Sequence, residues 1–155
     1  MSDHPVSRGP SVPPPIVAVG CLAVQVVLAR SAGTRPVPGR RLAAGVLAAA
    51  AFAAAGTAAR TLAEHGTTID ARDPSSASAL VTDGIYARTR NPIYLGLTLL
   101  LKAVAVWTGR VRCLLPVAGF VVYIDRVQIP AEEAALSARF GADFDAYRAA
   151  TRRWL

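Results

Sequence analysis

Residues 42–59 read LAAGVLAAAAFAAAGTAA, a run of eighteen residues without a charge. At 1.5 Å per residue, a helix of this length spans about 27 Å, close to the hydrocarbon core of a bilayer. The run lacks the polar face that an amphipathic helix of a soluble protein needs. It therefore predicts a transmembrane helix. Within it Gly45, Ala49 and Ala53 recur every fourth residue, which predicts a small-residue face that another helix can approach closely.

Three further apolar runs extend this prediction. Residues 16–28 form the first, for which a signal peptide is the alternative. A first membrane helix is favoured, because residues 30–35 make a poor cleavage site and further apolar runs follow. Residues 93–108 and 113–124 flank a tight turn at 109–110, and we expect two tilted spanning helices, with a re-entrant hairpin as the alternative. The predicted fold is all-α, an integral membrane bundle of about four transmembrane helices.

The composition supports lipid as the solvent. Hydrophobic residues make up 53% of the chain and charged residues 17%, with a net charge of +7 carried by arginine and one lysine. The arginines lie at the ends of apolar runs and in the tail, so nucleic-acid binding is not expected. The two cysteines lie in different apolar runs and the two histidines are isolated, so the sequence predicts no metal site and no disulfide framework.

The chain divides into three expected parts. Residues 1–15 are a disordered tail, because the three prolines at 13–15 should keep a helix from starting earlier. Residues 16–59 hold two N-terminal transmembrane helices. Residues 60–155 form the core that carries the chemistry, built from a connecting loop, a helical hairpin and an amphipathic C-terminal helix.

Two segments of this core lie outside the apolar runs. The loop at residues 60–91 is too long to be structureless, and we expect it to fold against the membrane face with a short extended or helical piece near 79–81. From Pro130 we expect a soluble amphipathic helix, interrupted at Gly141. Its apolar stripe consists of Leu136, Phe140, Phe144 and Tyr147.

The distribution of arginines predicts the orientation. Ten arginines lie on the side of the N-terminus, the long loop and the tail, and six lie on the other side. The positive-inside rule therefore places the loop and tail in the cytoplasm. Lys102 falls in the middle of an apolar run, where an ionisable residue is a functional candidate by default. Snorkelling and burial near Gln25 are its ordinary explanations, and we assign it no role.

Two polar stretches stand out against this apolar background. Residues 80–96 read LVTDGIYARTRNPIYLG and residues 128–133 read QIPAEE. A hairpin between them would bring both to the same membrane face. Taken singly they have ordinary explanations: an Asn-Pro helix start, acids favoured at a helix N-terminus, an aromatic belt at the interface, and arginines that set topology.

Together, these stretches resemble the isoprenylcysteine carboxyl methyltransferase family, within the wider group of membrane phospholipid methyltransferases. The family pattern has Leu-Val-x-x-Gly-x-Tyr, then Arg-His/Asn-Pro-x-Tyr-x-Gly, a helical hairpin, a Glu-Glu pair and an aromatic tail. The matching residues here are Leu80, Val81, Gly84, Tyr86, Arg90, Asn91, Pro92, Tyr94, Gly96, Glu132, Glu133, Phe140, Gly141, Phe144 and Tyr147. The closing residues 152–155, RRWL, also resemble bacterial members.

The resemblance implies a pocket for S-adenosylmethionine at the cytosolic face. Arg90 would pair with the cofactor's carboxylate, and Glu133 would deprotonate an amine acceptor. Arg126 and Gln128 lie where eukaryotic members place a substrate-binding arginine, and Asn91 stands where those members have His. The implied cofactor contacts are Leu80, Val81, Tyr86, Asn91, Pro92, Tyr94 and Glu132.

The expected function is methyl transfer to a lipid-like or prenylated acceptor in a bacterial inner membrane. The resemblance favours carboxylate O-methylation over phospholipid amine N-methylation, and a non-catalytic membrane subunit that kept the fold is a further alternative. No GxGxxG motif follows a strand pattern, which disfavours a soluble Rossmann methyltransferase.

Overall fold

The computed structural model describes residues 12–30, 37–67 and 78–155. All regular structure in these residues is helical, which confirms the all-α prediction. The elements are α1 (Pro14–Ala29), α2 (Arg40–Glu64), a 3-10 helix η2 (Gly84–Ala87), α3 (Pro92–Thr108), a 3-10 turn η3 (Val111–Cys113), α4 (Leu114–Tyr123), a π-helical turn η4 (Ile124–Gln128), α5 (Ile129–Phe140) and α6 (Ala142–Ala150).

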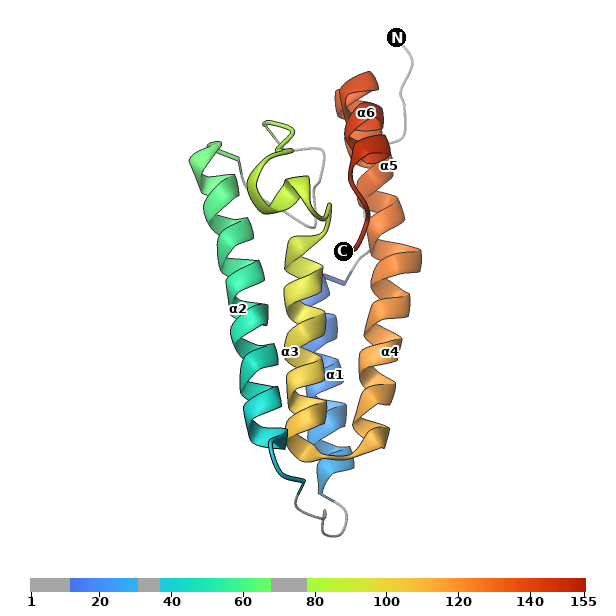
Figure 1. The fold of residues 1–155 in the computed structure, drawn as a ribbon. Coiled ribbons are helices and arrows are strands. Elements are labelled where there is room, and N and C mark those ends of the chain that lie inside the picture. Colours follow the sequence, from blue (N-terminus) through green and yellow to red (C-terminus); the bar gives the residue numbers. More distant parts are fainter. Residues whose placement is uncertain (1–11, 31–36, 68–77) are drawn as a thin grey trace.

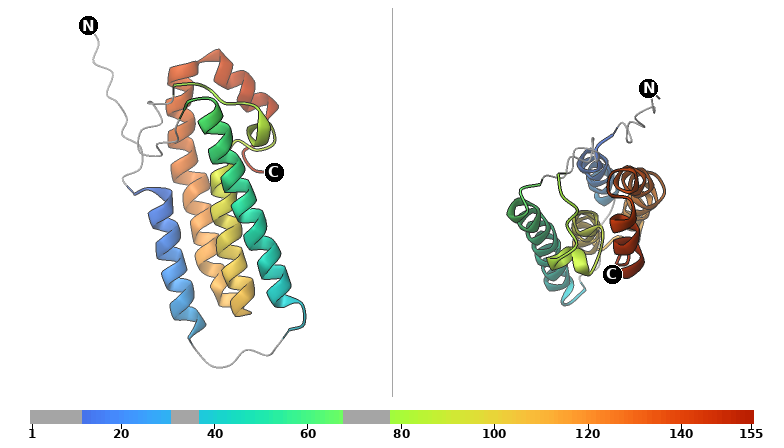
Figure 2. Two further views of the ribbon diagram at one scale, coloured as in Figure 1. Left: turned by 90° about the vertical axis from the view of Figure 1, so that its left-hand side faces the viewer. Right: turned by 90° about the horizontal axis from the view of Figure 1, so that it is seen from above.

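Helices α1 to α4 lie side by side in an up-and-down bundle (Figures 1 and 2). Helix α3 contacts each of the other three. One end of the bundle carries η2, the start of α3, α5 and α6, and we call it the site end. The other end carries the end of α1, the start of α2 and the turn after Gly109, and we call it the turn end.

Two helices are long and apolar enough to cross a membrane: α2, with 25 residues, and the continuous helix Val111–Phe140, with 30. Helices α1 and α3 are apolar but shorter, with 16 and 17 residues. Helix α1 begins two residues before the expected start, because proline is tolerated in the first turn of a helix. The count of four spanning helices stays a prediction.

The helix expected from Pro130 is present and ends before Gly141, but it does not begin at Pro130. The chain runs from α4 through η4 into α5 as one helix. Pro130 has no N–H, and its ring would clash with the carbonyl of residue 126 in a regular α-helix. The π-helical turn just before it widens the helix, and Ile129 N–H donates to the carbonyl of Ile124. The acids at 132 and 133 are therefore carried on a rigid extension of a bundle helix.

The small-residue face of α2 is also not the predicted one. Gly45, Ala49 and Ala53 are exposed, and the buried alanines are Ala44, Ala51 and Ala58. Consecutive residues on a helix differ by about 100°, and the run of alanines offers several equivalent stripes. Which stripe packs is decided by α3, whose glycine at position 96 lies against α2.

Gly96 should not tolerate a side chain. A Cβ there would lie 2.9 Å from the carbonyl oxygen of Ala51 and 3.2 Å from Cβ of Ala55, so the two helices would have to separate. We expect Gly96→Ala to lower the free energy of unfolding by about 1–3 kcal/mol, the usual cost of overpacking. Thermal unfolding in detergent, followed by circular dichroism, measures the change. Gly56→Ala is the matched control, because nothing lies within 4 Å of its Cβ position. Equal melting of the two variants would contradict the close approach.

A buried glutamine joins α1 to its neighbours. Gln25 is fully buried, and its Nε2 donates to the carbonyl oxygens of Leu101 and Cys113, each at 2.9 Å. Helix α1 is thereby held both to α3 and to the start of α4. Lys102, next to Leu101, is exposed, so the alternative that it is buried near Gln25 is wrong.

Candidate functional site

The hairpin of α3 and α4–α5 brings the two polar stretches together, as the sequence predicted. Tyr94 on α3 donates its hydroxyl hydrogen bond to Oε1 of Glu132 on α5. Gln128, one turn earlier, donates from Nε2 to the same oxygen at 2.7 Å. The Glu132 carboxylate is thus held in place by two neutral donors from both arms of the hairpin.

A cavity of about 250 Å³ lies beside this carboxylate. Its volume is close to the lower end of small-molecule pockets, which span about 300–1,000 Å³. Six of the nine residues predicted to be catalytic or cofactor-binding line it: Tyr86, Arg90, Asn91, Pro92, Tyr94 and Glu132. The other lining residues are Pro15, Ile93 and Leu97, which sequence reasoning missed because apolar residues in a helix carry no signal of a pocket.

The polar groups of the cavity suit a ligand with hydrogen-bonding and cationic groups. The hydroxyl of Tyr86 is buried and has no hydrogen-bond partner among the described residues. Burial raises the pKa of Tyr86, with smaller contributions from Tyr147 and Glu132, so the hydroxyl stays protonated. A buried donor without a partner costs free energy that a ligand can recover.

Tyr86 is positioned by the C-terminal helix. Tyr147 on α6 donates its hydroxyl to the backbone carbonyl of Tyr86 at 2.7 Å, and burial raises the pKa of Tyr147 to about 12. Phe144 packs in the same apolar cluster. The expected ordered piece of the long loop is therefore η2 at Gly84–Ala87, and the residues at 79–81 have no regular structure.

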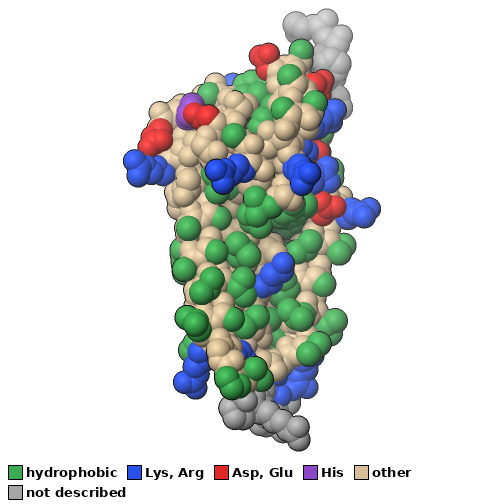
Figure 3. Space-filling view, in the orientation of Figure 1, with side chains coloured by type: hydrophobic (Ala, Val, Ile, Leu, Met, Phe, Trp, Pro, Cys, Tyr) green, Lys and Arg blue, Asp and Glu red, His purple; other side chains and the backbone are tan. Residues whose placement is uncertain are grey.

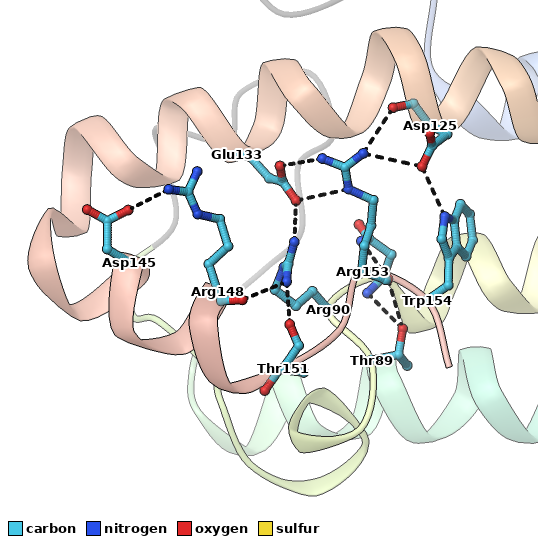
Figure 4. A network of polar contacts seen from close by, with 10 residues as sticks. Thr89, Arg90, Asp125, Glu133, Asp145, Arg148, Thr151, Arg153 and Trp154 are labelled. Atoms are coloured by element: carbon cyan, nitrogen blue, oxygen red, sulfur yellow. Dashed lines mark hydrogen bonds and ion pairs between the residues drawn. The ribbon is translucent and has the colours of Figure 1, made fainter.

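Glu133 lies between two arginines (Figure 4). Its Oε1 is 2.7 Å from Nη2 of Arg90, and its Oε2 is 2.7 Å from Nη2 of Arg153. Arg153 also reaches Oδ1 of Asp125 at 3.3 Å, and the indole of Trp154 donates to that same oxygen at 3.0 Å. Side chains from the segment before α3, from η4 and α5, and from the C-terminus thus share one ionic network.

The last residues of the chain, 151–155, form what we call the C-terminal strap. The strap turns back from α6 toward the bundle (Figure 1) and binds the segment before α3. Arg90 N–H donates to the carbonyl of Arg152 at 2.9 Å. The Thr89 hydroxyl and the Asn91 side-chain amide donate to the carbonyl of Arg153, at 3.1 and 3.0 Å.

These contacts decide between explanations that the sequence left open. The Asn91 side chain does not cap α3, because it is bound to the strap, whereas Pro92 occupies the first helical turn as expected. Arg90 lines the cavity, but its Nη1 donates to the carbonyls of Arg148 and Thr151 and its Nη2 binds Glu133. The Arg90 guanidinium therefore joins α5, α6 and the strap.

Five predicted residues lie outside the cavity, and one of them is Glu133, which is held between Arg90 and Arg153. Leu80 and Val81 pack in the apolar cluster with Tyr86 beneath α6. Gln128 is buried and does not line the cavity, but its Nε2 donates to the cavity residue Glu132. The side chain of Arg126 is 80% exposed and pairs with its neighbour Asp125 at 3.3 Å. Two residues on a helix differ by about 200°, so Gln128 and Arg126 face different sides, and the structure does not bring Arg126 to the cavity.

Comparison with known proteins gives two matches. The sequence profile described as phospholipid methyltransferase matches residues 40–143, from the start of α2 into α6. An uncharacterised protein of Haemophilus influenzae is 38% identical over 63 residues, which are 41% of this chain and 100% of that protein. No solved structure matches.

Proposed function

This chain belongs to the phospholipid methyltransferase family, and on that premise we propose that it transfers a methyl group from S-adenosylmethionine to a lipid-like or lipid-anchored acceptor. The observation that carries the proposal is the cavity at Glu132, where six residues predicted from two distant stretches meet. The proposed setting is a bacterial inner membrane, with the site end facing the cytoplasm.

The residues of the cavity fit this cofactor. S-adenosylmethionine supplies an electrophilic methyl group on a positively charged sulfur. The Glu132 carboxylate, fixed by Tyr94 and Gln128, would attract its cationic groups. The faces of Tyr86 and Tyr94 would lie against the sulfonium, and the Tyr86 hydroxyl would gain a partner.

Methyl transfer asks mainly for alignment and exclusion of water, which explains why no catalytic triad is needed. The cavity walls Pro92, Ile93 and Leu97 are apolar and keep water away from the reacting groups. For the acceptor we propose a carboxylate. Nε of Arg90 is buried without a hydrogen-bond partner among the described residues, and could receive an anionic group.

Amine N-methylation is the second candidate, because the Glu132 carboxylate would equally attract an ammonium group. An amine must lose a proton before it attacks, and Glu133 was the predicted base. Both oxygens of Glu133 accept charge-assisted bonds from Arg90 and Arg153, which leaves it poorly placed to take that proton. This arrangement supports the carboxylate over the amine.

A second hollow supports a lipid-like acceptor. A groove of about 590 Å³ between α2 and α3 is lined largely by apolar side chains, including Ala53, Leu95 and Leu99. Thr89 lines this groove, and its neighbours in sequence line the first cavity. We propose that the groove holds the apolar chain of the acceptor while its head group reaches the cavity.

Calorimetric titration of S-adenosylmethionine into the detergent-purified chain tests the cofactor. We expect Glu132→Gln and Tyr94→Phe each to weaken binding, Glu132→Gln by roughly 10- to 100-fold, as for a lost hydrogen bond or ion pair to a charged group. The matched controls are Glu64→Gln and Tyr123→Phe, at residues outside the cavity. If the folded wild type does not bind S-adenosylmethionine, a non-catalytic subunit is favoured. If the control variants lose as much affinity as Glu132→Gln and Tyr94→Phe, the cavity is not the cofactor site.

Radiolabelled methyl transfer to a lipid extract then separates the acceptors. A carboxylate acceptor yields a methyl ester, whose label is released as methanol by mild base. An amine acceptor yields a base-stable N-methyl product. Base-stable label would therefore overturn carboxylate O-methylation while leaving the cofactor assignment intact.

A further inference from the structure

The acidic residues of this chain avoid the turn end entirely. The sequence has no Asp or Glu between Asp3 and Glu64, and none between Asp83 and Asp125. These two acid-free stretches contain all of the residues that form the turn end. Figure 3 shows the result on one face: basic side chains at both ends of the apolar middle, and acidic ones only toward the site end.

The turn end carries arginines but no acidic residues. Among the described residues the turn end carries Arg30, Arg40, Arg41, Arg110 and Arg112. At the site end, by contrast, Arg60, Arg90, Arg126, Arg148 and Arg153 each form an ion pair with an acid. Among the described residues, Arg30, Arg40, Arg41 and Arg112 form no ion pair with an acid.

Arg40 has hydrogen-bond donors that are not satisfied within the described residues. Its Nε and Nη1 are buried and have no hydrogen-bond partner among the residues that the structure describes. The guanidinium lies against Gly109, where even a Cβ would overlap it, so the turn after α3 is shaped around this side chain. Next to it, the Arg41 guanidinium stacks on the Trp107 ring at 5.7 Å from the centroid.

The surroundings of these arginines are apolar. Leu42 and Val111, directly beside them in sequence, are 74% and 83% exposed, and Leu115 is also exposed. An arginine cluster at the rim of an exposed apolar belt lies where the phosphate groups of a bilayer lie. Nucleic acid or an acidic protein would pair with the charges but would not bury the apolar side chains around them.

We propose that the turn end binds the phosphate groups of anionic phospholipids, with the Arg40 guanidinium as the central contact. This site is at the opposite end of the bundle from the Glu132 cavity and does not depend on methyl transfer. Basic pockets at the ends of membrane helices recognise such head groups through charge and hydrogen bonds together.

Lipid retention measured by native mass spectrometry tests the proposal without any activity assay. The detergent-purified chain is titrated with phosphatidylglycerol and with phosphatidylcholine of the same acyl chains. We expect wild type to retain phosphatidylglycerol preferentially. Arg40→Gln should weaken that retention by about fivefold, and Arg40→Gln with Arg112→Gln by roughly tenfold or more, as for loss of one and two charges at an anionic surface.

Arg60→Gln is the matched control, since it removes the same charge at the site end and should leave retention unchanged. Equal retention of the two lipids by wild type would overturn the proposal, and this comparison needs no variant to fold. Equal losses in Arg60→Gln would assign the effect to net charge rather than to the turn end. If inorganic phosphate competes fully with phosphatidylglycerol, the turn end is a simple anion site and not a lipid site.

Discussion

Glu133→Ala should lower the free energy of unfolding by about 3–5 kcal/mol, the cost of breaking a buried ion pair by removing one partner. Arg90 and Glu133 are 10% and 15% exposed, and Arg153 binds the other carboxylate oxygen. Without Glu133, two guanidinium groups would face each other in a largely dry network. The expected consequence is a loosened C-terminal strap, because the Arg153 guanidinium would keep only its weaker contacts with Asp125.

Thermal unfolding and tryptophan fluorescence together measure this effect. The chain has two tryptophans, so in a Trp107→Phe background the emission reports Trp154 on the strap. A red shift with Glu133→Ala would indicate that Trp154 has become exposed to solvent. Asp145→Ala removes an exposed pair with Arg148 and should change stability by less than about 1 kcal/mol. Equal melting of the two variants, with no red shift, would contradict the role of the network.

Gln25→Ala should lower the free energy of unfolding by about 2–4 kcal/mol. The substitution leaves a cavity in the packed centre of the bundle and removes both hydrogen bonds from α1 to the carbonyls of Leu101 and Cys113. Gln25 is the fully buried polar side chain of α1, so its loss should loosen that helix in particular. Hydrogen exchange of α1 amides, together with thermal unfolding, measures both effects.

Two variants separate the causes. Gln25→Leu keeps the volume and removes the hydrogen bonds, so it isolates the polar contribution. Leu22→Ala removes a partly exposed apolar side chain from the same helix and should cost much less. If Gln25→Leu is as stable as wild type, the amide contributes only volume, and the two hydrogen bonds do not hold α1.

Much of the fold follows from local patterns. The apolar runs specify the bundle helices, because a helix satisfies its own backbone hydrogen bonds and uncharged side chains can face either lipid or a protein core. The turn at Gly109 and the break at Gly141 are set by glycines with φ of +67° and +53°, which other residues rarely adopt. The meeting of Tyr94 with Glu132 follows once two helices of similar length are joined by a short turn.

The C-terminal strap could not be placed from the sequence. Residues 152–155 show no hydrophobic periodicity and contain no turn-forming residue. Their position depends on partners such as Arg90 and Asn91, about sixty residues earlier. The same holds for the ionic network, since Asp125 and Arg153 become neighbours only when the chain returns to the bundle.

The sequence by itself determined the helices, the small turns and the two stretches that form the cavity, because periodicity, charge and glycine act within a few residues of one another. Only the tertiary structure decided which stripe of α2 packs on Gly96, that Gln128 contacts Glu132 while Arg126 is exposed, and that the helix continues through Pro130. Each of these is a choice between locally equivalent faces or conformations, and the contacts that decide it come from residues far away in the chain.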